Sequence, residues 1–293
     1  MVRLGPNSYG KAQVRVVRVA RGAAADGGDL IRDWNVSTSL SGDLADSHLT
    51  GDNAKVLPTD SQKNRVYALA RELGAVEPET FAGELARFFT SSQEAITRAR
   101  IRVDEYAWTP AGGTGYSFAR SGELIRTTTV THDVARGTTV ISGIQDLVLM
   151  NTTGSQFLGF PRDPYTTLAE TTDRILATQV DALWRFRPEA IADTDWGAVF
   201  VVARQTVLDT FARTRTCSLQ QMLHALGAAV ITAVPAVCEV RLALPNKHHF
   251  VVDLSPFGLD NDREVYHAAD RPYGLIEGTV LADDAPDPGI AWT

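Results

Sequence analysis

Three polar side chains that could move a proton stand far apart in the chain: Lys11, Thr59 and His248. A threonine hydroxyl is too weak an acid to act alone as a base, whereas a partly desolvated lysine is easier to deprotonate. A histidine can pass a proton near neutral pH. Each residue type also has an ordinary explanation, as a solvated lysine before a strand, a threonine that caps a helix and a histidine in a turn.

Three further side chains could recognise a flat ligand: Arg174, Gln220 and Phe157. A guanidinium grips a carbonyl edge with parallel hydrogen bonds, an amide both donates and accepts, and an aromatic ring stacks on a planar face. Taken alone, these residues are better explained as a solvated helix arginine, an exposed helix glutamine and a core phenylalanine. Their assignment to chemistry therefore needs the wider pattern of the chain.

Metal and nucleotide cofactors are not expected. The cysteines Cys217 and Cys238 belong to no C-x-x-C pair or Cys/His cluster, so neither a zinc site nor a disulfide framework is predicted. Neighbours on a regular strand point to opposite faces, so the doublet His248-His249 cannot chelate one metal. The sequence also lacks the glycine-rich motifs that bind phosphates and dinucleotides. We therefore predict no cofactor, and an oxidoreductase reaction would run without nicotinamide or flavin.

The composition favours a soluble globular protein of two domains. The chain has 293 residues, of which 44% are hydrophobic, and can bury one large core or two of ordinary domain size. Its formal net charge of −7 excludes a global field that attracts nucleic acid or anionic membranes, so an anionic ligand must be held by a local cationic site. No apolar stretch approaches the length of a membrane helix, and the amino end lacks the apolar segment of a secretory signal.

The hydrophobic periodicity predicts two similar halves. In the first half, the expected order is strand, strand, helix, helix, strand, strand, over residues 14–20, 30–40, 60–73, 79–90, 95–109 and 116–132. The second half repeats this order over residues 138–151, 179–187, 196–213, 219–232, 236–244 and 273–281. We therefore predict an α+β chain of two ββααββ units, at residues 1–135 and 136–293.

Several short motifs stand where the chain should be irregular or where an element should end. They are YGK (residues 9–11), LPTDSQKN (57–64), SQFLGFPRD (155–163), YTTL (165–168), TTDRIL (171–176), SLQ (218–220) and LPNKHHF (244–250). Each motif is weak by itself. In this order and spacing they closely resemble the uricase (urate oxidase) family across nearly the whole chain.

The resemblance implies a tunnelling fold (T-fold), with two ββααββ units of antiparallel sheet in each subunit. In that fold two subunits close a barrel, two barrels stack into a homotetramer, and the active sites lie at subunit interfaces. The open edges of four-stranded sheets give a physical reason for closure through neighbouring subunits. The carboxyl end, AWT, is not the peroxisomal tripeptide SKL, so a bacterial-like cytoplasmic location is expected.

The resemblance also implies which residues bind the substrate. Arg174 matches the arginine that grips one carbonyl edge of urate, Gln220 matches the amide that reads the opposite edge, and Phe157 matches the ring that stacks on the purine. Leu168 and Leu219 would close the apolar rim.

The catalytic trio implied by the resemblance is Lys11, Thr59 and His248. Asn246 matches the amide that helps to bind oxygen or water, and Asp60 would contribute chiefly its backbone N–H to the substrate. The implied reaction is the oxidation of urate by O2 and water to 5-hydroxyisourate and hydrogen peroxide, a step of purine degradation. No cofactor is needed there, because the urate dianion is itself the reductant.

Two other functions stay open at this point. The chain could be a T-fold lyase or hydrolase that acts on pterins or purines, but such proteins typically anchor the base with a glutamate, and here Arg174 and Gln220 occupy that role. It could instead be a catalytically silent urate-binding protein. Such a protein would be expected to have lost Lys11, Thr59 or His248, and all three are present.

Overall fold

The computed structural model describes residues 2–269 and 271–293, and the chain divides into two compact units. The first unit comprises the described residues up to 143, together with residues 185–197 and 286–293. The second comprises residues 144–184 and 198–285. Helices accompany a large antiparallel sheet, so the predicted α+β class is confirmed. The predicted repeat boundary between residues 135 and 136 stays a prediction.

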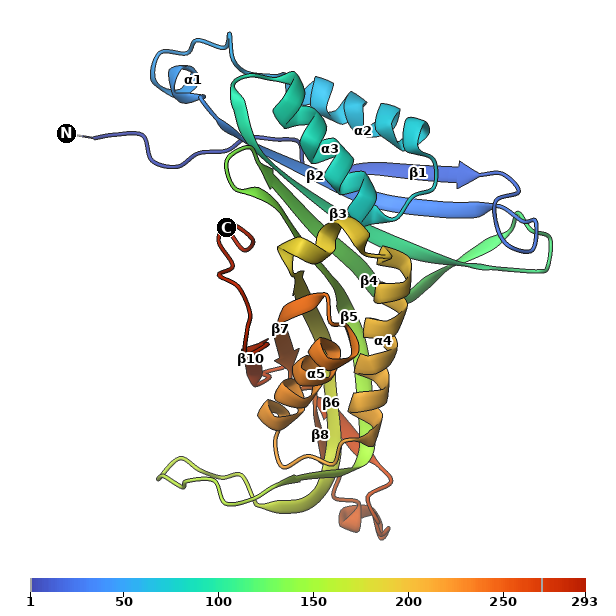
Figure 1. Cartoon of the computed structure of the whole chain (residues 1–293). Helices are drawn as coiled ribbons and strands as arrows, with labels where there is room; N and C mark the ends of the chain where they lie inside the picture. Colours follow the sequence, from blue (N-terminus) through green and yellow to red (C-terminus); the bar gives the residue numbers. More distant parts are fainter. Residues whose placement is uncertain (1, 270) are drawn as a thin grey trace. The chain divides into compact units, whose positions relative to one another are not determined.

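In the first unit, the strands hydrogen-bond in the order β1-β2-β3-β4, and each pairing is antiparallel. Helices α2 and α3 lie across one face of these strands (Figure 1). The elements are β1 (Val14–Ala20), β2 (Leu30–Gly42), α1 (Ala45–Leu49), α2 (Thr59–Leu73), α3 (Pro78–Ser92), β3 (Ile96–Pro110) and β4 (Phe118–Asp133), followed by the first residues of β5 (Gly137–Phe157).

The core of the first unit forms between alternating strand residues and the apolar stripe of α3. Every second side chain of β2 from Trp34 to Leu40 is buried, as expected for a strand with one covered face. On α3, the apolar side chains Phe81, Leu85 and Phe89 recur at every fourth residue and are fully buried. The ring centroids of Trp34 and Phe81 are 4.7 Å apart, so helix and sheet interlock through aromatic contact.

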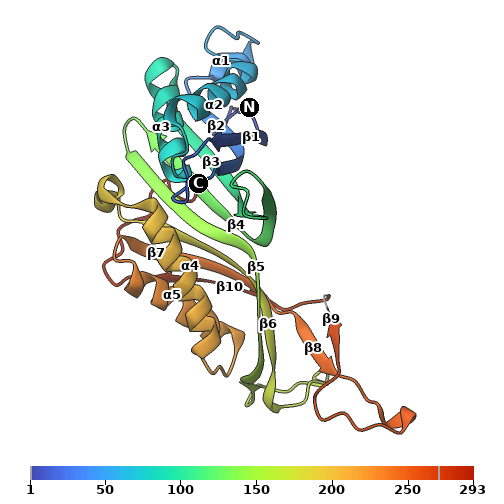
Figure 2. The same ribbon diagram turned by 90° about the vertical axis from the view of Figure 1, so that its right-hand side faces the viewer.

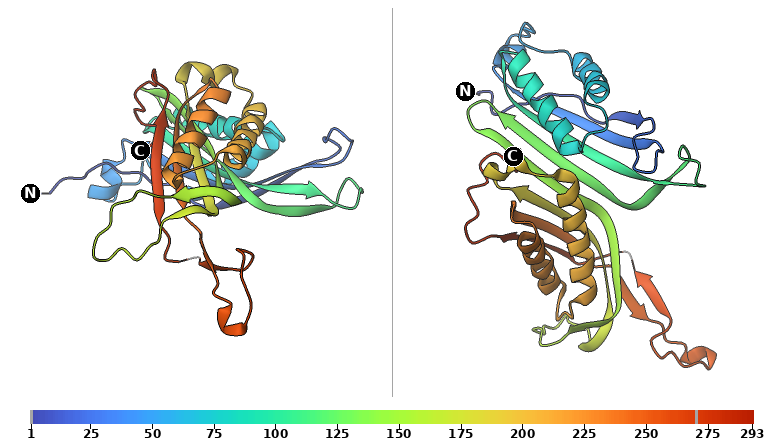
Figure 3. Two further views of the ribbon diagram at one scale, coloured as in Figure 1. Left: turned by 90° about the horizontal axis from the view of Figure 1, so that it is seen from below. Right: turned by 45° about the vertical axis from the view of Figure 1, so that its right-hand side comes forward.

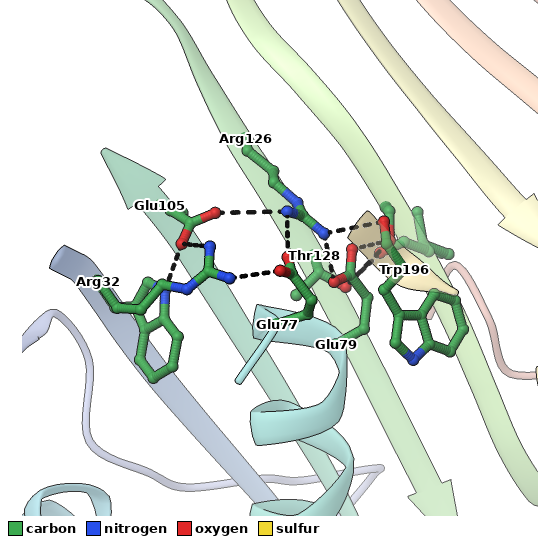
Figure 4. Close-up of polar contacts among 10 residues, drawn as sticks. Arg32, Glu77, Glu79, Glu105, Arg126, Thr128 and Trp196 are labelled. Carbon is green, nitrogen blue, oxygen red and sulfur yellow. Dashed lines mark hydrogen bonds and ion pairs between the residues drawn. The ribbon is translucent and has the colours of Figure 1, made fainter. Parts of the chain in front are cut away.

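A cluster of arginine and glutamate side chains lies at the edge of this core (Figure 4). Arg126 on β4 contacts Glu77 at 2.6 Å and Glu79 at 2.8 Å, where α3 begins. Arg32 on β2 contacts Glu105 at 3.0 Å and also pairs with Glu77. The two strand arginines therefore anchor the first turn of α3. Removing one partner of such a buried pair typically costs about 3–5 kcal/mol, because the other charge is left uncompensated.

Glu79 is the most deeply buried carboxylate of this cluster. Burial raises the pKa of Glu79, while the charge of Arg126 and a hydrogen bond from the Ser142 hydroxyl oppose that rise. The Ser142 hydroxyl donates at 2.7 Å to one carboxylate oxygen, and Arg126 donates to the other. Both oxygens of Glu79 therefore have partners, which a buried carboxylate requires.

In the second unit, the strands follow the order β5-β6-β7-β10, and α4 and α5 cover one face of them (Figure 2). Strands β8 and β9 pair with each other and project as a separate arm of this unit (Figure 3). Besides β5, the elements are β6 (Thr171–Phe186), η1 (Pro188–Asp193), α4 (Trp196–Arg213), α5 (Leu219–Ala233), β7 (Val237–Pro245), β8 (His248–Val251), η2 (Ser255–Phe257), β9 (Tyr266–Ala269) and β10 (Leu275–Leu281).

The core of the second unit is built mainly from apolar groups. Alternating residues of β6, such as Val180 and Trp184, are fully buried. Helix α5 approaches the sheet closely at Gly227, where an added Cβ would stand 2.5 Å from a methyl group of Val280 on β10. A side chain at this position would therefore push the helix away from the strand. None of the helices in the described part of the chain is long and apolar enough to cross a membrane.

The predicted helices and strands are all present, and the differences lie at their ends. β5 extends to Phe157 and β6 begins at Thr171, whereas the apolar pattern places these ends at residues 151 and 179. Residues 152–156 and 171–174 are polar or glycine and carry little hydrophobic signal, so periodicity did not include them. The apolar residues 175–177 belong to β6 as well, and the predicted strand began too late to contain them. Arg174 consequently lies on a strand, and its explanation as a solvated helix arginine is wrong. The short elements α1, η1, β8, η2 and β9 were not predicted.

Candidate functional site

Lys11 of the first unit lies in the segment that precedes β1, alongside β2. Its backbone N–H donates to the Thr38 hydroxyl at 2.9 Å, and its carbonyl accepts from the Thr38 N–H at 2.9 Å. Two residues earlier, Tyr9 exchanges backbone hydrogen bonds with Leu40. The segment therefore runs alongside β2, and Thr38 holds the Lys11 backbone at both its N–H and its carbonyl, while the Lys11 side chain is half-buried.

Thr59 and Asp60 begin helix α2 of the same unit. Pro58 is the N-cap residue and makes no side-chain hydrogen bond, and Thr59 is the first helical residue. The interpretation of Thr59 as the helix cap is therefore wrong. Hydrogen bonds from Lys63 lower the pKa of the exposed Asp60, and the charge of Lys11 adds a smaller lowering effect. Lys11 thus lies close enough to the start of α2 for its charge to act there.

A cavity of about 360 Å³ in the second unit contains several of the predicted site residues. Phe157, Leu168, Arg174, Asn246 and His248 all line it. Phe157 ends β5 and Arg174 lies near the start of β6, so neighbouring strands supply the ring and the cation. A concave site with an aromatic wall and a few converging polar groups is typical of a small-molecule pocket.

Arg174 is half-buried and lies beside Phe157. Its guanidinium carbon is 5.0 Å from the centre of the Phe157 ring, and its Nε–H points to the hydroxyl oxygen of the buried Ser155 at 3.5 Å. The Ser155 oxygen also accepts from the Thr216 hydroxyl at 3.4 Å. Burial lowers the pKa of Arg174, although a guanidinium remains charged at any physiological pH. The cavity therefore presents a planar cation that an anionic ligand could use.

Asn246 and His248 reach the cavity because the chain after β7 is attached to β6. The Lys247 N–H donates to the carbonyl of Ala177 at 2.8 Å, and the Thr178 hydroxyl donates to the carbonyl of Pro245 at 2.9 Å. These bonds fix the turn between β7 and β8 just beyond Arg174 along β6. The interpretation of this segment as a turn is thus compatible with a place in the site.

The ring of His248 stacks on Phe250, with ring centroids 5.8 Å apart. Burial lowers the pKa of His248, and the nearby positive charge of Arg174 and the neighbouring His249 lower it further. The imidazole is therefore neutral at neutral pH, so one ring nitrogen can accept a proton while the other donates a hydrogen bond.

Leu219 and Gln220 do not line this cavity. Both lie at the first turn of α5, where Leu219 is buried and the Gln220 side chain is exposed. The Ser218 hydroxyl caps this helix by accepting from the Gln221 N–H at 3.2 Å. The structure therefore brings together four of the predicted substrate-binding residues with the predicted catalytic His248, and leaves Leu219 and the amide of Gln220 outside the cavity wall.

Other cavity residues were not singled out in the sequence. Arg263, in the loop before β9, and Tyr266, the first residue of β9, line the cavity, and Arg263 pairs with Asp173 at 3.3 Å. The loop between β8 and β9 has no periodicity that could have indicated this. His249 also lines the cavity, although it is the strand neighbour of His248. In the part of the chain that the structure describes, no cluster of His, Cys, Asp and Glu suits a metal ion.

The comparison with protein families shows to which family the chain belongs. The uricase family model matches residues 7–131 and 140–277. The chain belongs to the uricase family. Uricase from Arthrobacter globiformis is 44% identical over 292 residues, covering 100% of this chain and 94% of that protein. Uricase from Dictyostelium discoideum is 37% identical over 96% of this chain and 98% of its own length.

Solved uricase structures agree in fold. The crystal structure of uricase from Arthrobacter globiformis superposes with a TM-score of 0.94 at 43% identity, and the match covers 100% of this chain and 99% of that one. The crystal structure of a uricase from Bacillus fastidious matches with a TM-score of 0.80 at 25% identity, covering 95% and 94% of the two chains. The uricase fold therefore extends over the whole chain.

Proposed function

We propose that this uricase family member is a urate oxidase that converts urate, O2 and water into 5-hydroxyisourate and hydrogen peroxide. The observation that carries the proposal is the cavity of the second unit, where Arg174, Phe157 and His248 meet. Urate is a flat, anionic purine with alternating carbonyl and N–H groups along its rim. A desolvated guanidinium beside an aromatic ring suits such a molecule in charge and in shape.

In the proposed binding mode, Arg174 donates to one carbonyl edge of urate and Phe157 stacks on the purine face. Leu168 lies at the apolar rim of the cavity. The proposal adds Leu219 to this rim and lets Gln220 read the edge opposite Arg174, although both residues lie outside the cavity wall at the first turn of α5. Because the Gln220 side chain is exposed at the first turn of α5, it is free to turn toward a ligand. Electrostatic stabilisation by Arg174 together with backbone N–H groups would be the largest contribution of the protein to the reaction.

The proposed proton transfer uses Lys11, Thr59 and His248. The Lys11 amine takes a proton from the Thr59 hydroxyl as that hydroxyl takes one from the urate monoanion, and His248 exchanges a proton with this pair. The Asp60 backbone N–H donates to the substrate. The more electron-rich urate then gives electrons to O2, which is held with the help of Asn246.

The reaction balances without an added redox group. Urate loses two electrons, and O2 gains two electrons and two protons to leave as hydrogen peroxide. Water then adds to the oxidised purine to give 5-hydroxyisourate. Adding purified protein to urate in chelator-treated buffer should therefore consume urate and O2 and form peroxide in a 1:1:1 ratio. Binding of urate without peroxide would instead identify a silent binding protein, and loss of oxidation that one metal restores would contradict the cofactor-free reaction.

We further propose that a complete site is shared between subunits of a homotetramer, as in the T-fold. The predicted site residues are divided between the two units. The first unit contains Lys11, Thr59 and Asp60, and the second contains Phe157, Arg174, Gln220, Asn246 and His248. Strand β1 ends the strand order of the first unit and β10 ends that of the second, and open strand edges favour pairing with another chain. Both observations support the assembly of several chains.

Complementation tests the shared site. Thr59→Ala and Arg174→Ala subunits, each inactive alone, should regain activity when they are unfolded and refolded together, because mixed interfaces contain an intact site. The control is each variant refolded with itself. An active monomer in sedimentation experiments, or mixed oligomers without recovered turnover, would rule out the shared site.

A further inference from the structure

One side chain of helix α2 is polar although it lies on the buried, otherwise apolar face of the helix. Gln62 lies on the face of α2 that also carries Val66 and Leu69, and all three residues are buried. Gln62 itself has an exposed fraction of 0%. A buried amide must find hydrogen-bond partners, because leaving it unpaired is costly.

The partners of Gln62 come from two separate segments. The Thr38 hydroxyl on β2 donates to Oε1 at 2.6 Å, and Nε2 donates to the carbonyl oxygen of Leu57 at 3.4 Å. The Leu57 carbonyl can only accept a hydrogen bond, so the amide nitrogen must face it and the amide oxygen must face Thr38. The orientation of the amide is therefore determined by its surroundings.

Each of these segments leads to a residue of the proposed proton pathway. Thr38 holds the backbone of Lys11 through two hydrogen bonds of 2.9 Å. The contact is close, because an added Cβ on Gly10 would stand 1.8 Å from the Thr38 carbonyl oxygen. Only Pro58 separates Leu57 from Thr59, and the proline ring restricts the backbone between them.

We propose that Gln62 is a positioning residue that sets the spacing between Lys11 and Thr59. Its amide links the strand that holds the lysine backbone to the turn that carries the threonine. The proposal rests on the proposed roles of Lys11 and Thr59. Proton transfer between two groups depends steeply on their geometry, so a small displacement should slow turnover more than it weakens urate binding.

The test is steady-state kinetics of Gln62→Met, which keeps the length of the side chain and removes both hydrogen bonds. We expect turnover to fall about tenfold, with the KM for urate within about twofold of wild type, because the cavity of the second unit is untouched. In a Lys11→Met background the same substitution should cause no further loss. Unchanged turnover in the single variant, or a full additional loss in the double variant, would overturn the proposal.

A second pair of variants covers the case in which Gln62→Met does not fold. Thr38→Val removes the hydroxyl between Gln62 and Lys11, and Thr38→Ser keeps it. Turnover should fall in the valine variant and recover in the serine variant, and equal turnover in both would overturn the proposal. Thr128→Val is the matched control, because it removes another buried hydroxyl of this unit, which donates to the Ile141 carbonyl, and should keep wild-type turnover.

The same experiments separate this proposal from the one on which it rests. If Lys11→Met and Thr59→Val keep wild-type turnover, the proposed proton pathway fails, and Gln62 has no pair to position. If both variants lose turnover while Gln62→Met and Thr38→Val do not, only the positioning role fails.

Discussion

The two groups of candidate residues are held in different ways. In the first unit, Lys11 and Thr59 are half-buried and lie on backbone segments that a buried Thr38–Gln62 pair connects. In the second unit, Arg174 and Phe157 lie in the wall of a cavity, and their own side chains are partly desolvated. This difference fits the proposed function, in which the cavity binds urate and the pair Lys11 and Thr59 transfers the proton.

Replacing the lysine should have the largest effect and should separate the two roles. We expect Lys11→Met to lower turnover by about 100-fold or more, the range typical for loss of a general acid or base, with a nearly unchanged KM for urate. Stopped-flow measurement of urate absorbance would show this. Lys55→Met is the control, since Lys55 pairs with Asp43 and Asp46 on an exposed loop and should keep its turnover. A raised KM with full turnover would reverse the proposed division.

Substitution of the cavity arginine should weaken both urate binding and turnover. Arg174→Lys replaces a planar two-pronged donor by a point charge. We expect kcat/KM to fall by an amount that corresponds to about 1.5–3 kcal/mol of transition-state stabilisation. The matched control is Arg263→Lys, because this half-exposed arginine lines the same cavity and already pairs with Asp173. Equal losses in the two variants would mean that the cavity needs positive charge and not the geometry of Arg174.

Replacing the polar residue at the start of a helix should lower the free energy of unfolding in α5 but hardly change it in α2. Ser218 caps α5 through its hydroxyl, so Ser218→Ala should lower the free energy of unfolding by about 0.5–2 kcal/mol. Thr59 makes no cap bond, so Thr59→Ala should change it by less than about 0.5 kcal/mol. Denaturant unfolding at one protein concentration measures both. A large decrease in the free energy of unfolding of Thr59→Ala would instead mean that the threonine stabilises the helix.

The smallest expected effect is electrostatic. Removing the positive charge in Arg174→Met makes protonation of His248 easier, so the pKa of His248 should rise toward its ordinary value, while burial, the larger cause, still holds it lowered. An NMR titration of the imidazole C–H signals would report it, with Arg263→Met as the control. A fall in this pKa, or an equal rise in the control, would contradict the proximity of Arg174 to His248.

The element order followed from hydrophobic periodicity, but several polar positions did not. Alternation placed β1 and β2, and the recurrence of Phe81, Leu85 and Phe89 predicted α3. The polar start of β6 carried no such signal, since its pairing depends on hydrogen bonds to other strands. A sharper interpretation was available at Gln62, because a glutamine on the apolar face of a predicted helix indicates a buried polar contact.

The sequence by itself determined the family and the order of the elements, because spaced motifs and repeating apolar positions are local properties of the chain. It also supplied the types of side chain that the chemistry needs. Only the tertiary structure decided that Phe157, Arg174 and His248 share one cavity and that Gln220 stands outside its wall. The physical reason is that such contacts join residues from different strands and loops, and strand pairing and packing alone determine which of them meet.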